Sequence, residues 1–371
     1  VSDVPLGAFL SGGIDSSAIV ALMSQLSANK VKTFSIGFDD ADYDELKYAK
    51  NIANRFNTEH KEFIVRPKAL DILPLLVERY GEPYADSSCI PTYYVAQQTK
   101  QYVTVALNGD GGDELFAGYE RYQAMLTAEK IPNLAKKILG GFSALMPDSI
   151  NFRSRARRIK RFINGAILPL PARYLKWVSI FDDNFKWSVY SDDFIKSAGQ
   201  SNALNFITSF LNVPTGAALI DSLLFTDTMT YLPNDLLVKV DIATMANSLE
   251  ARSPFLDQEL MEFAAKLPAE YKIKNFIRKY ILKKAIKDLL PQENINRRKM
   301  GFGVPVGNWF RDELKDLLCE SILSRASLSM GYFNPDAVKN MLRLHIEKKA
   351  DYSAQLWALL CLELWHQRFM G

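Results

Sequence analysis

Cysteine and histidine are scarce in this chain of 371 residues, which contains three of each. The cysteines Cys89, Cys319 and Cys361 are odd in number, lie far apart and include no CxxC pair, which argues against a disulfide scaffold and against a zinc site. The histidines show no HExxH spacing, so a catalytic zinc is not expected either. This usage is typical of reduced thiols, and we expect a cytoplasmic protein.

Long apolar runs and a strong charge of either sign are also missing. No apolar segment approaches the roughly 20 residues that a membrane span needs, so we expect no membrane partner. The net charge is +3 at pH 7, lower than a basic nucleic-acid binder usually carries, which argues against nucleic acid as the partner. The sequence begins at Val1 without an initiator Met or a signal pattern, and a candidate strand follows at once, so we expect a fragment of a longer gene product.

What the chain does contain is 48% hydrophobic residues, enough for a large core. Up to about residue 110, strand-like apolar runs alternate with segments of helical spacing, which predicts an α/β fold with a doubly wound parallel sheet. The expected strands cover residues 4–10, 32–38, 60–65 and 102–107; the expected helices cover 16–26, 44–56 and 68–80, with another starting at 86–88. Beyond about residue 120, helical patterns dominate and predict a helical C-terminal extension.

A glycine-rich turn, SGGIDSS at residues 11–17, follows the first expected strand and precedes the first expected helix. Its glycines let the backbone approach a ligand closely, and the backbone N–H groups at a helix N-terminus form an anion site. Asp15 would repel a phosphate unless Mg²⁺ lies between them. The turn has neither the Lys of a GxxxxGK[ST] loop nor a GxGxxG pattern. The simpler alternative is a tight turn with a serine capping the helix.

A second turn, NGDGGDE at residues 108–114, follows the strand expected at 102–107. Ligands of open parallel sheets bind at the carboxyl ends of the strands, where this turn would lie. Three acidic residues and three glycines could form a Mg²⁺ site, and the alternative is a solvated acidic turn. Considered together, the two turns predict one phosphate ligand, with the second turn supplying a further carboxylate to the magnesium ion beside Asp15.

These motifs carry a resemblance to a known family. SGGIDSS resembles the pyrophosphate loop of ATP pyrophosphatases, and NGDGGDELFAGY is similar to the SGxGxDE-x-F-x-GY segment of asparagine synthetases and β-lactam synthetases, with Asn108 where Ser is frequent. Further matches follow in order: YLPNDLLVKVD at 231–241, SLEARSPFLD at 248–257, KYILK at 279–283 and RRKMGFGVP at 297–305. The resemblance covers about residues 1–120 and 225–312, and identifies the chain as the synthetase part of an asparagine synthetase of the glutamine-hydrolysing type.

The resemblance implies a domain organisation. It implies a sheet of the adenine-nucleotide alpha hydrolase type, also called the PP-loop ATPase type. Residues 1–120 would be the ATP-binding core, 121–220 a helical insertion with a basic stretch at 153–161, and 221–371 the mostly helical remainder. The N-terminal glutaminase domain of the family would lie outside this sequence, so ammonia would be used directly or supplied by that missing domain. A homodimer is among the assemblies that we expect.

Site residues follow from the resemblance by position. ATP and Mg²⁺ are the implied cofactors, with Mg²⁺ on Asp15 and Asp113. Residues implied to bind ATP are Leu10, Ser11, Gly12, Gly13, Asp15, Ser16 and Ser17 at the phosphates, Ile36 and Gly37 at the adenine, and Gly109 and Asp110 beside nucleotide and acyl substrate. The implied catalytic residues are Lys279, Asp110 and Glu250. Glu250 could equally be structural, as part of an acid–base pair with Arg252.

The implied reaction activates a carboxylate, in the first instance aspartate, as an acyl-AMP with release of pyrophosphate, and ammonia then forms the amide. Alternatives within the enzyme class act on another carboxylate, as β-lactam synthetases, lasso-peptide cyclases and enzymes that amidate surface polysaccharides do. A tRNA-modifying ATP pyrophosphatase is a further alternative, because the basic stretch at 153–161 could bind phosphates. The simpler interpretation of this stretch is the solvated face of a helix. A non-catalytic binding module is the last alternative.

Overall fold

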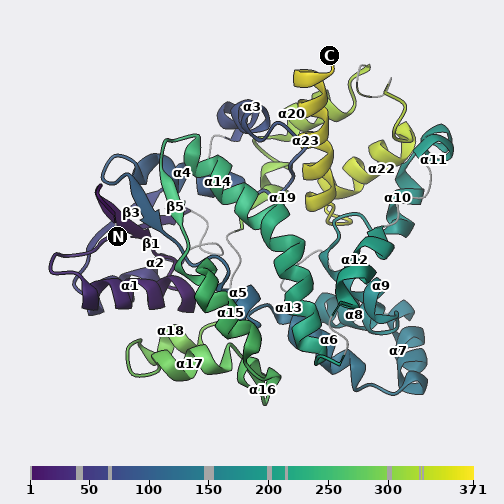
Figure 1. Ribbon diagram of the computed structural model, residues 1–371. Coiled ribbons are helices and arrows are strands. Elements are labelled where there is room, and N and C mark those ends of the chain that lie inside the picture. The colour runs from purple at the N-terminus through teal and green to yellow at the C-terminus, as the bar shows by residue number, and fades with distance from the viewer. Residues whose placement is uncertain are drawn as a thin grey trace. The chain divides into compact units, whose positions relative to one another are not determined.

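A computed structural model of the chain describes residues 2–38, 45–65, 69–145, 154–198, 203–213, 216–298, 303–325, 327 and 330–371. The chain forms two compact units (Figure 1). Unit 1 comprises Val1–Ile72, Asp86–Gln123 and Gly216–Val304, and unit 2 comprises Leu73–Ala85, Ala124–Thr215 and Pro305–Gly371. The domain organisation expected from sequence stays a prediction. Among the described residues, no helix combines the length and the apolar character of a membrane span.

Unit 1 contains a five-stranded sheet in which every neighbouring pair of strands is parallel. The strand order is β3-β2-β1-β4-β5. The strands are β1 (Leu6–Phe9), β2 (Lys32–Gly37), β3 (Glu59–Ile64), β4 (Val105–Leu107) and β5 (Glu250–Arg252). This confirms the predicted α/β fold class and the four expected strands. The strand expected from residue 102 begins later, because the N–H groups of Tyr102 and Val103 both donate to Thr99 O in the turn that ends a helix.

The strand order places a topological switch point between β1 and β4. From β1 the chain adds β2 and β3 on one side, and it later adds β4 and β5 on the other. The loops that leave the carboxyl ends of β1 and β4 therefore turn in opposite directions and leave a crevice between them. These are the two glycine-rich turns, at residues 11–13 and 108–111. The topology alone thus makes this edge the expected ligand site.

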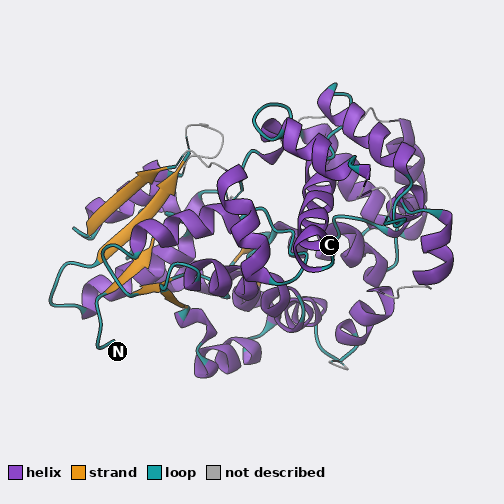
Figure 2. Cartoon of the chain, turned by 90° about the horizontal axis from the view of Figure 1, so that it is seen from above, coloured by secondary structure: helices purple, strands orange, loops and turns teal. Residues whose placement is uncertain are grey.

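Helices cover both faces of the sheet. On one face, α1 (Ile14–Leu26) and α2 (Leu46–Arg55) bury an apolar cluster with β1. On the other, α4 (Cys89–Thr99) packs over Phe34 and Ala106, and α14 (Val238–Met245) packs against α4. In Figure 2 the orange strands of the main sheet have purple helices along them. The predicted helices at 16–26, 44–56 and 68–80 are confirmed as α1, α2 and α3, although residues 44 and 68 lie outside the described residues, and α4 begins directly after residues 86–88.

Further elements complete unit 1. They are α5 (Gly112–Phe116), α13 (Leu219–Met229), the π-helix η1 (Leu232–Leu237), the 3-10 helix η2 (Pro254–Leu256), α15 (Gln258–Lys266), α16 (Ala269–Lys272), β6 (Ile273–Lys274), β7 (Ile277–Arg278), α17 (Tyr280–Ile286) and α18 (Gln292–Asn296). β6 and β7 form an antiparallel hairpin whose two loop residues, Asn275 and Phe276, have φ of 48° and 63°. Two consecutive positive φ values are typical of a type I′ turn.

Unit 2 is built of helices. The remaining helices are α3 (Ala69–Tyr80), α6 (Glu120–Glu129), α7 (Asn133–Leu145), α8 (Arg155–Ala166), α9 (Leu170–Val178), α10 (Asp183–Val189), α11 (Asp192–Ala198), α12 (Ala203–Leu211), α19 (Val306–Trp309), α20 (Lys315–Ile322), α22 (Pro335–Ile346) and α23 (Ser353–Phe369). The apolar side of α23 is buried against α19 and α20. The basic stretch starts outside the described residues and continues into α8. There Arg157 pairs with Asp351 at 2.9 Å, and Arg161 Nη2 donates to Trp177 O.

Candidate active site

A cavity of about 520 Å³ opens in unit 1 at the carboxyl ends of β1, β2 and β4. Its volume lies in the range of small-molecule and cofactor sites, which is roughly 300–1,000 Å³. Both glycine-rich turns line it, as do residues from α4, α14, α17 and α18. The cavity therefore brings together parts of the chain that are far apart in sequence, at the switch point of the sheet.

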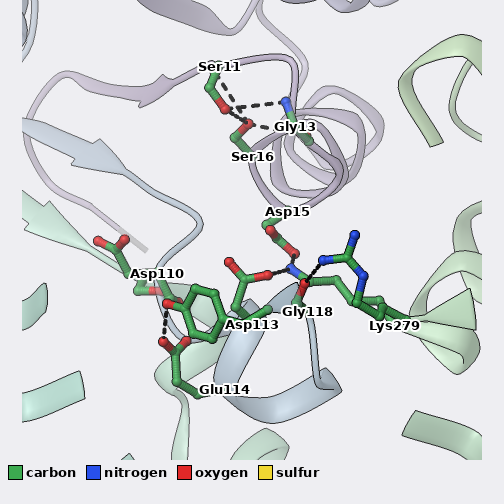
Figure 3. A network of polar contacts seen from close by, with 12 residues as sticks. Ser11, Gly13, Asp15, Ser16, Asp110, Asp113, Glu114, Gly118 and Lys279 are labelled. Atoms are coloured by element: carbon green, nitrogen blue, oxygen red, sulfur yellow. Dashed lines mark hydrogen bonds and ion pairs between the residues drawn. The ribbon is translucent and has the colours of Figure 1, made fainter. Parts of the chain in front are cut away.

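One ammonium group joins the two turns. Lys279 Nζ lies 2.5 Å from Asp15 Oδ1 and 2.6 Å from Asp113 Oδ1, and Figure 3 shows it between the two carboxylates. Asp15 stands in the first turn of α1, Asp113 in the first turn of α5, and Lys279 immediately before α17. All three residues are buried. Two acids and one cation leave a local charge of about −1, so the arrangement suits additional positive charge.

The backbone of Lys279 is held in an uncommon conformation. Its φ is 53°, in the left-handed region, which costs roughly 1–2 kcal/mol for a residue with a Cβ. Two contacts hold it there: Lys279 N donates to Phe116 O at 3.1 Å, and Lys279 O accepts from Lys283 N at the start of α17. Lys279 directly follows the β6–β7 hairpin, so the hairpin and the helix together direct its side chain toward the two aspartates.

Gly118 makes room for this contact. A Cβ at this position would lie 1.7 Å from Asp113 Oδ1 and 2.1 Å from Lys279 Cε, so any side chain would collide with both partners. Gly118 O also accepts from Arg278 Nη1 at 2.6 Å, which ties the end of the second motif to the residue before Lys279. The motif thus needs glycine at position 118, because the side chains of Asp113 and Lys279 pack directly against its Cα.

The first turn holds its own hydroxyl groups in place. Ser11 Oγ and Ser16 Oγ lie 3.1 Å apart, and Ser11 Oγ accepts from Gly13 N at 3.3 Å (Figure 3). The helix that follows is thirteen residues long, so its N-terminal N–H groups and its dipole favour an anion at this point.

Residues far along the chain donate hydrogen bonds to the backbone of this first turn. Asn294 Nδ2 donates at 3.0 Å both to Gly12 O and to Tyr48 O, and Arg297 Nη1 donates to Ser11 O at 3.1 Å. Gly12 has φ of 71°, and a Cβ there would lie 2.4 Å from the backbone of Tyr48. The turn is therefore fixed before any ligand binds, as a preorganised anion site requires.

The second turn is shaped by its first residue. Asn108 Oδ1 accepts from Asp110 N at 3.3 Å, a local bond that a serine hydroxyl could also make, so Asn108 fits where relatives of the motif have Ser. Asp110 O accepts from Ser253 Oγ, which links the turn to the SLEARSPFLD segment. Asp110 also lines the cavity.

Glu114 is a buried acid in the same turn that the sequence did not single out. It accepts from Tyr119 Oη at 2.5 Å (Figure 3). Burial, followed by the charge of Asp113, raises the pKa of Glu114 to about 7. Burial, together with the charge of Glu114, raises the pKa of Tyr119 well above its usual value, so Tyr119 stays a donor at neutral pH.

Most of the residues that the sequence proposed for ATP, metal and catalysis converge. Those that line the cavity are Leu10, Ser11, Gly13, Asp15, Ser16, Ile36, Gly109, Asp110, Asp113 and Lys279. Gly12, Ser17, Gly37 and Glu250 do not line it. Glu250 is exposed on β5 and accepts from Arg252 Nε at 2.6 Å, so its catalytic role stays a prediction without support from its position.

Gly12, Ser17 and Gly37 support the site from within the fold. Gly12 shapes the turn, Gly37 ends β2, and the buried Ser17 Oγ has no hydrogen-bond partner among the described residues. Cavity residues to which the sequence assigned no individual role include Asp86, Glu114, Lys239 and Arg278. Lys239 lies within the YLPNDLLVKVD segment that resembles the family, and this segment was the only feature of the sequence that could have pointed to a functional role for Lys239.

The donor set fits a magnesium ion. Two buried carboxylates from separate turns contact a single positive point, and Mg²⁺ typically takes one or two protein carboxylates and completes its octahedron with phosphate oxygens and water. Among the described residues, no group of three His, Cys, Asp or Glu side chains forms an all-protein metal cage. The site therefore suits a cation that arrives with a phosphate ligand.

Comparisons with known proteins agree with this chemistry. The family model described as asparagine synthase matches residues 1–367. The chain is 35% identical over 370 residues to glutamine-hydrolysing asparagine synthetase 1 of Bacillus subtilis strain 168, covering 98% of this chain and 56% of that protein. A protein of Mycobacterium tuberculosis H37Rv, provisionally named a glutamine-hydrolysing asparagine synthetase, is 32% identical over 384 residues (100% and 55%).

A more distant relative carries a different name. Amidase chyE of Penicillium rubens is 24% identical over 392 residues, covering 94% of this chain and 56% of that protein. The chain thus spans about half the length of the curated relatives that it matches.

Proposed function

Because the chain belongs to the asparagine synthase family, we propose that it is an AMP-forming carbon–nitrogen ligase that converts aspartate and ammonia into asparagine. A carboxylate oxygen of aspartate attacks the α-phosphorus of ATP, the bond to the bridging oxygen breaks, and pyrophosphate leaves with the electron pair. Ammonia then attacks the acyl carbon, a proton is released and AMP departs. The observation that carries the proposal is the single ammonium of Lys279 between Asp15 and Asp113, in a cavity lined by both glycine-rich turns.

In the proposed reaction, positive groups of the chain would bind the phosphates and the aspartates would bind the metal ion. Backbone N–H groups of the first turn and the N-terminus of α1 bind the pyrophosphate part of ATP. Lys279 stabilises negative charge that moves onto the phosphate oxygens during attack. Asp15 and Asp113 would hold Mg²⁺, which supplies further positive charge to the phosphates. Asp110, which lines the cavity, would contact the acyl substrate and the nucleotide.

The experiment that tests the proposal is exchange of labelled pyrophosphate into ATP, with aspartate and a panel of other carboxylic acids. Lys279→Ala should keep ATP binding but lower exchange by about 10²- to 10³-fold, the usual effect of removing one preorganised charge. Lys284→Ala is the matched control, because Lys284 lies on the same helix and is exposed. Unchanged exchange in Lys279→Ala would remove this lysine from the mechanism.

A second candidate is amide formation on a carboxylate other than aspartate. The relative named an amidase favours it, since that protein matches nearly the whole chain. The acid panel separates the two candidates, because only the true substrate supports exchange. Ammonium supplied in place of glutamine tests ammonia as the attacking nitrogen.

The location and assembly of the protein also remain proposals. We place it in the cytoplasm, where thiols stay reduced, in line with the absence of a disulfide among its three cysteines, all of which are described. A homodimer is the proposed assembly, and light scattering at several protein concentrations tests it.

A further inference from the structure

A second buried ion pair lies in the same cavity and has no part in the steps above. Lys239 Nζ, from α14, donates to Asp86 Oδ2 at 2.9 Å, and both residues line the cavity. The side chain of Lys239 is 11% exposed and that of Asp86 is 24% exposed. Asp86 precedes α4 and also accepts from Ser88 N at 2.9 Å, so its carboxylate is held in one orientation.

Both members of the pair keep their charges. Burial lowers the pKa of Lys239, but the charges of Asp86, Asp110 and Asp235 outweigh it and the net shift is upward. Burial raises the pKa of Asp86, but Lys239 and the bonds from Ser88 outweigh it and the net shift is downward. An ion pair of this kind stabilises a fold little, because desolvation offsets most of the attraction. Its position in a ligand cavity therefore calls for a binding role.

We propose that Lys239 and Asp86 recognise the head group of an amino-acid substrate, Lys239 receiving its α-carboxylate and Asp86 its α-ammonium. The inference rests on the proposed ligase function and deepens it. The pair is neutral as a whole, and so is a zwitterionic head group. Exchange of one ion pair for two new ones leaves no buried charge without a partner. The β-carboxylate of aspartate then remains for attack on ATP.

The geometry makes a prediction about substrate choice. Succinate keeps the reacting carboxylate and lacks the α-ammonium, so it would leave Asp86 without its new partner. β-Alanine keeps the ammonium and lacks the α-carboxylate, so it would leave Lys239 without its partner. A site built for a polar group rejects an analogue that lacks it, and we expect kcat/KM to fall by about 10²-fold or more for each.

The experiment compares pyrophosphate exchange for aspartate, succinate and β-alanine in variants of the pair. Asp86→Asn should lower kcat/KM for aspartate by about 10²-fold and leave succinate within about threefold, so the preference collapses. Lys239→Met should lower kcat/KM for aspartate by about 10²-fold and leave kcat/KM for β-alanine within about threefold. The KM for ATP should stay unchanged in both, and the double variant Asp86→Asn with Lys239→Met keeps the cavity neutral if a single change unfolds the protein.

The matched control is Lys272→Met. Lys272 is also a buried lysine of unit 1, paired with Asp221 at 2.6 Å, but it does not line the cavity. It should lower the Tm as the pair variants do and keep the preference for aspartate over succinate. A rise in the KM for ATP with an unchanged aspartate-to-succinate ratio in Asp86→Asn would overturn the proposal and place the pair at the nucleotide.

The two proposals fail in different ways. If the wild-type protein exchanges pyrophosphate with an acid that has no amino group and not with aspartate, an AMP-forming ligase activity stands, but aspartate as its substrate and the head-group site are both refuted. If it exchanges with no acid at all, the ligase function fails. Calorimetric titration of aspartate and succinate into wild-type protein and Asp86→Asn then still tests the pair, and equal affinities of the wild type for the two acids would overturn it.

Discussion

Replacing Gly118 by alanine adds one methyl group at the most crowded point of the candidate active site. The new Cβ would lie 1.7 Å from Asp113 Oδ1 and 2.1 Å from Lys279 Cε. Carbon and oxygen atoms need about 3 Å or more, so the carboxylate and the lysine must each move by about 1 Å. Both side chains are buried, which leaves little space for that movement.

The size of the effect follows from this displacement. Catalytic groups misplaced by about 1 Å commonly lower rates by about 10²-fold, which corresponds to roughly 3 kcal/mol in the barrier. We therefore expect Gly118→Ala to lower pyrophosphate exchange by about 10²-fold. ATP binding should change little, because the first turn, which we propose as the phosphate-binding element, is held by separate contacts from Asn294 and Arg297.

The assay is pyrophosphate exchange, with ATP binding measured by calorimetry and folding checked by circular dichroism. Gly141→Ala is the control, because Gly141 lies in a helix with no atom within 4 Å of its added Cβ, and it should be neutral or slightly stabilising. If Gly118 acts through Lys279, the double variant Gly118→Ala with Lys279→Ala should be no slower than Lys279→Ala alone. Additive losses, or a wild-type rate in Gly118→Ala, would refute the reasoning.

Three further predictions concern the charges of unit 1. Lys279→Met removes the ammonium group that contacts Asp15 and Asp113, so Mg²⁺ without ATP should raise the Tm of this variant more than that of the wild type; an equal rise would show that the carboxylates share no cation site. The folded-state pKa of Glu114 is about 7 against a usual 4.5, so its ionisation opposes folding, and stability is lost as pH rises from about 4.5 through 7. Chemical denaturation should show the wild type losing about 3 kcal/mol relative to Glu114→Gln over that range, and parallel pH profiles would contradict this. Asp227→Ala should lower the free energy of unfolding in urea by about 3–5 kcal/mol, because it removes a fully buried carboxylate that lies 2.6 Å from the half-buried Arg121; a loss below about 1 kcal/mol would show that the site relaxes.

The sequence predicted the parts of the site that depend on local patterns. Glycines and acids at fixed spacing after an apolar run identify both turns, and the alternation of strands and helices places them at the same edge of the sheet. Spacing and sheet topology therefore predicted that acids of the two turns share a metal, and the family resemblance identified them as Asp15 and Asp113. Lys279 came only from the family resemblance, since a lysine in a helical pattern is usually exposed.

The sequence did not predict the elements whose conformation is set by distant contacts. Strand β5 has three residues and no alternation of its own, and it forms because the edge of β4 pairs with it. The β6–β7 hairpin has Asn-Phe in its loop where Asn-Gly is the recognisable signal. Asp86 and Lys239 are 153 residues apart, and no local pattern connects them. Each of these features depends on tertiary packing.

The sheet order also has a consequence for synthesis of the chain. Ribosomes add about 5–20 residues per second, so the aspartates of the first and second turns emerge many seconds before Lys279, which lies 264 residues after Asp15. Until residue 252 has emerged the nascent sheet lacks β5, and until Lys279 has emerged the two aspartates lack the lysine that pairs with them in the finished fold. A chain released after residue 252 could complete the sheet and would still lack Lys279. Premature termination there would therefore give the five-stranded sheet without the lysine that pairs with Asp15 and Asp113.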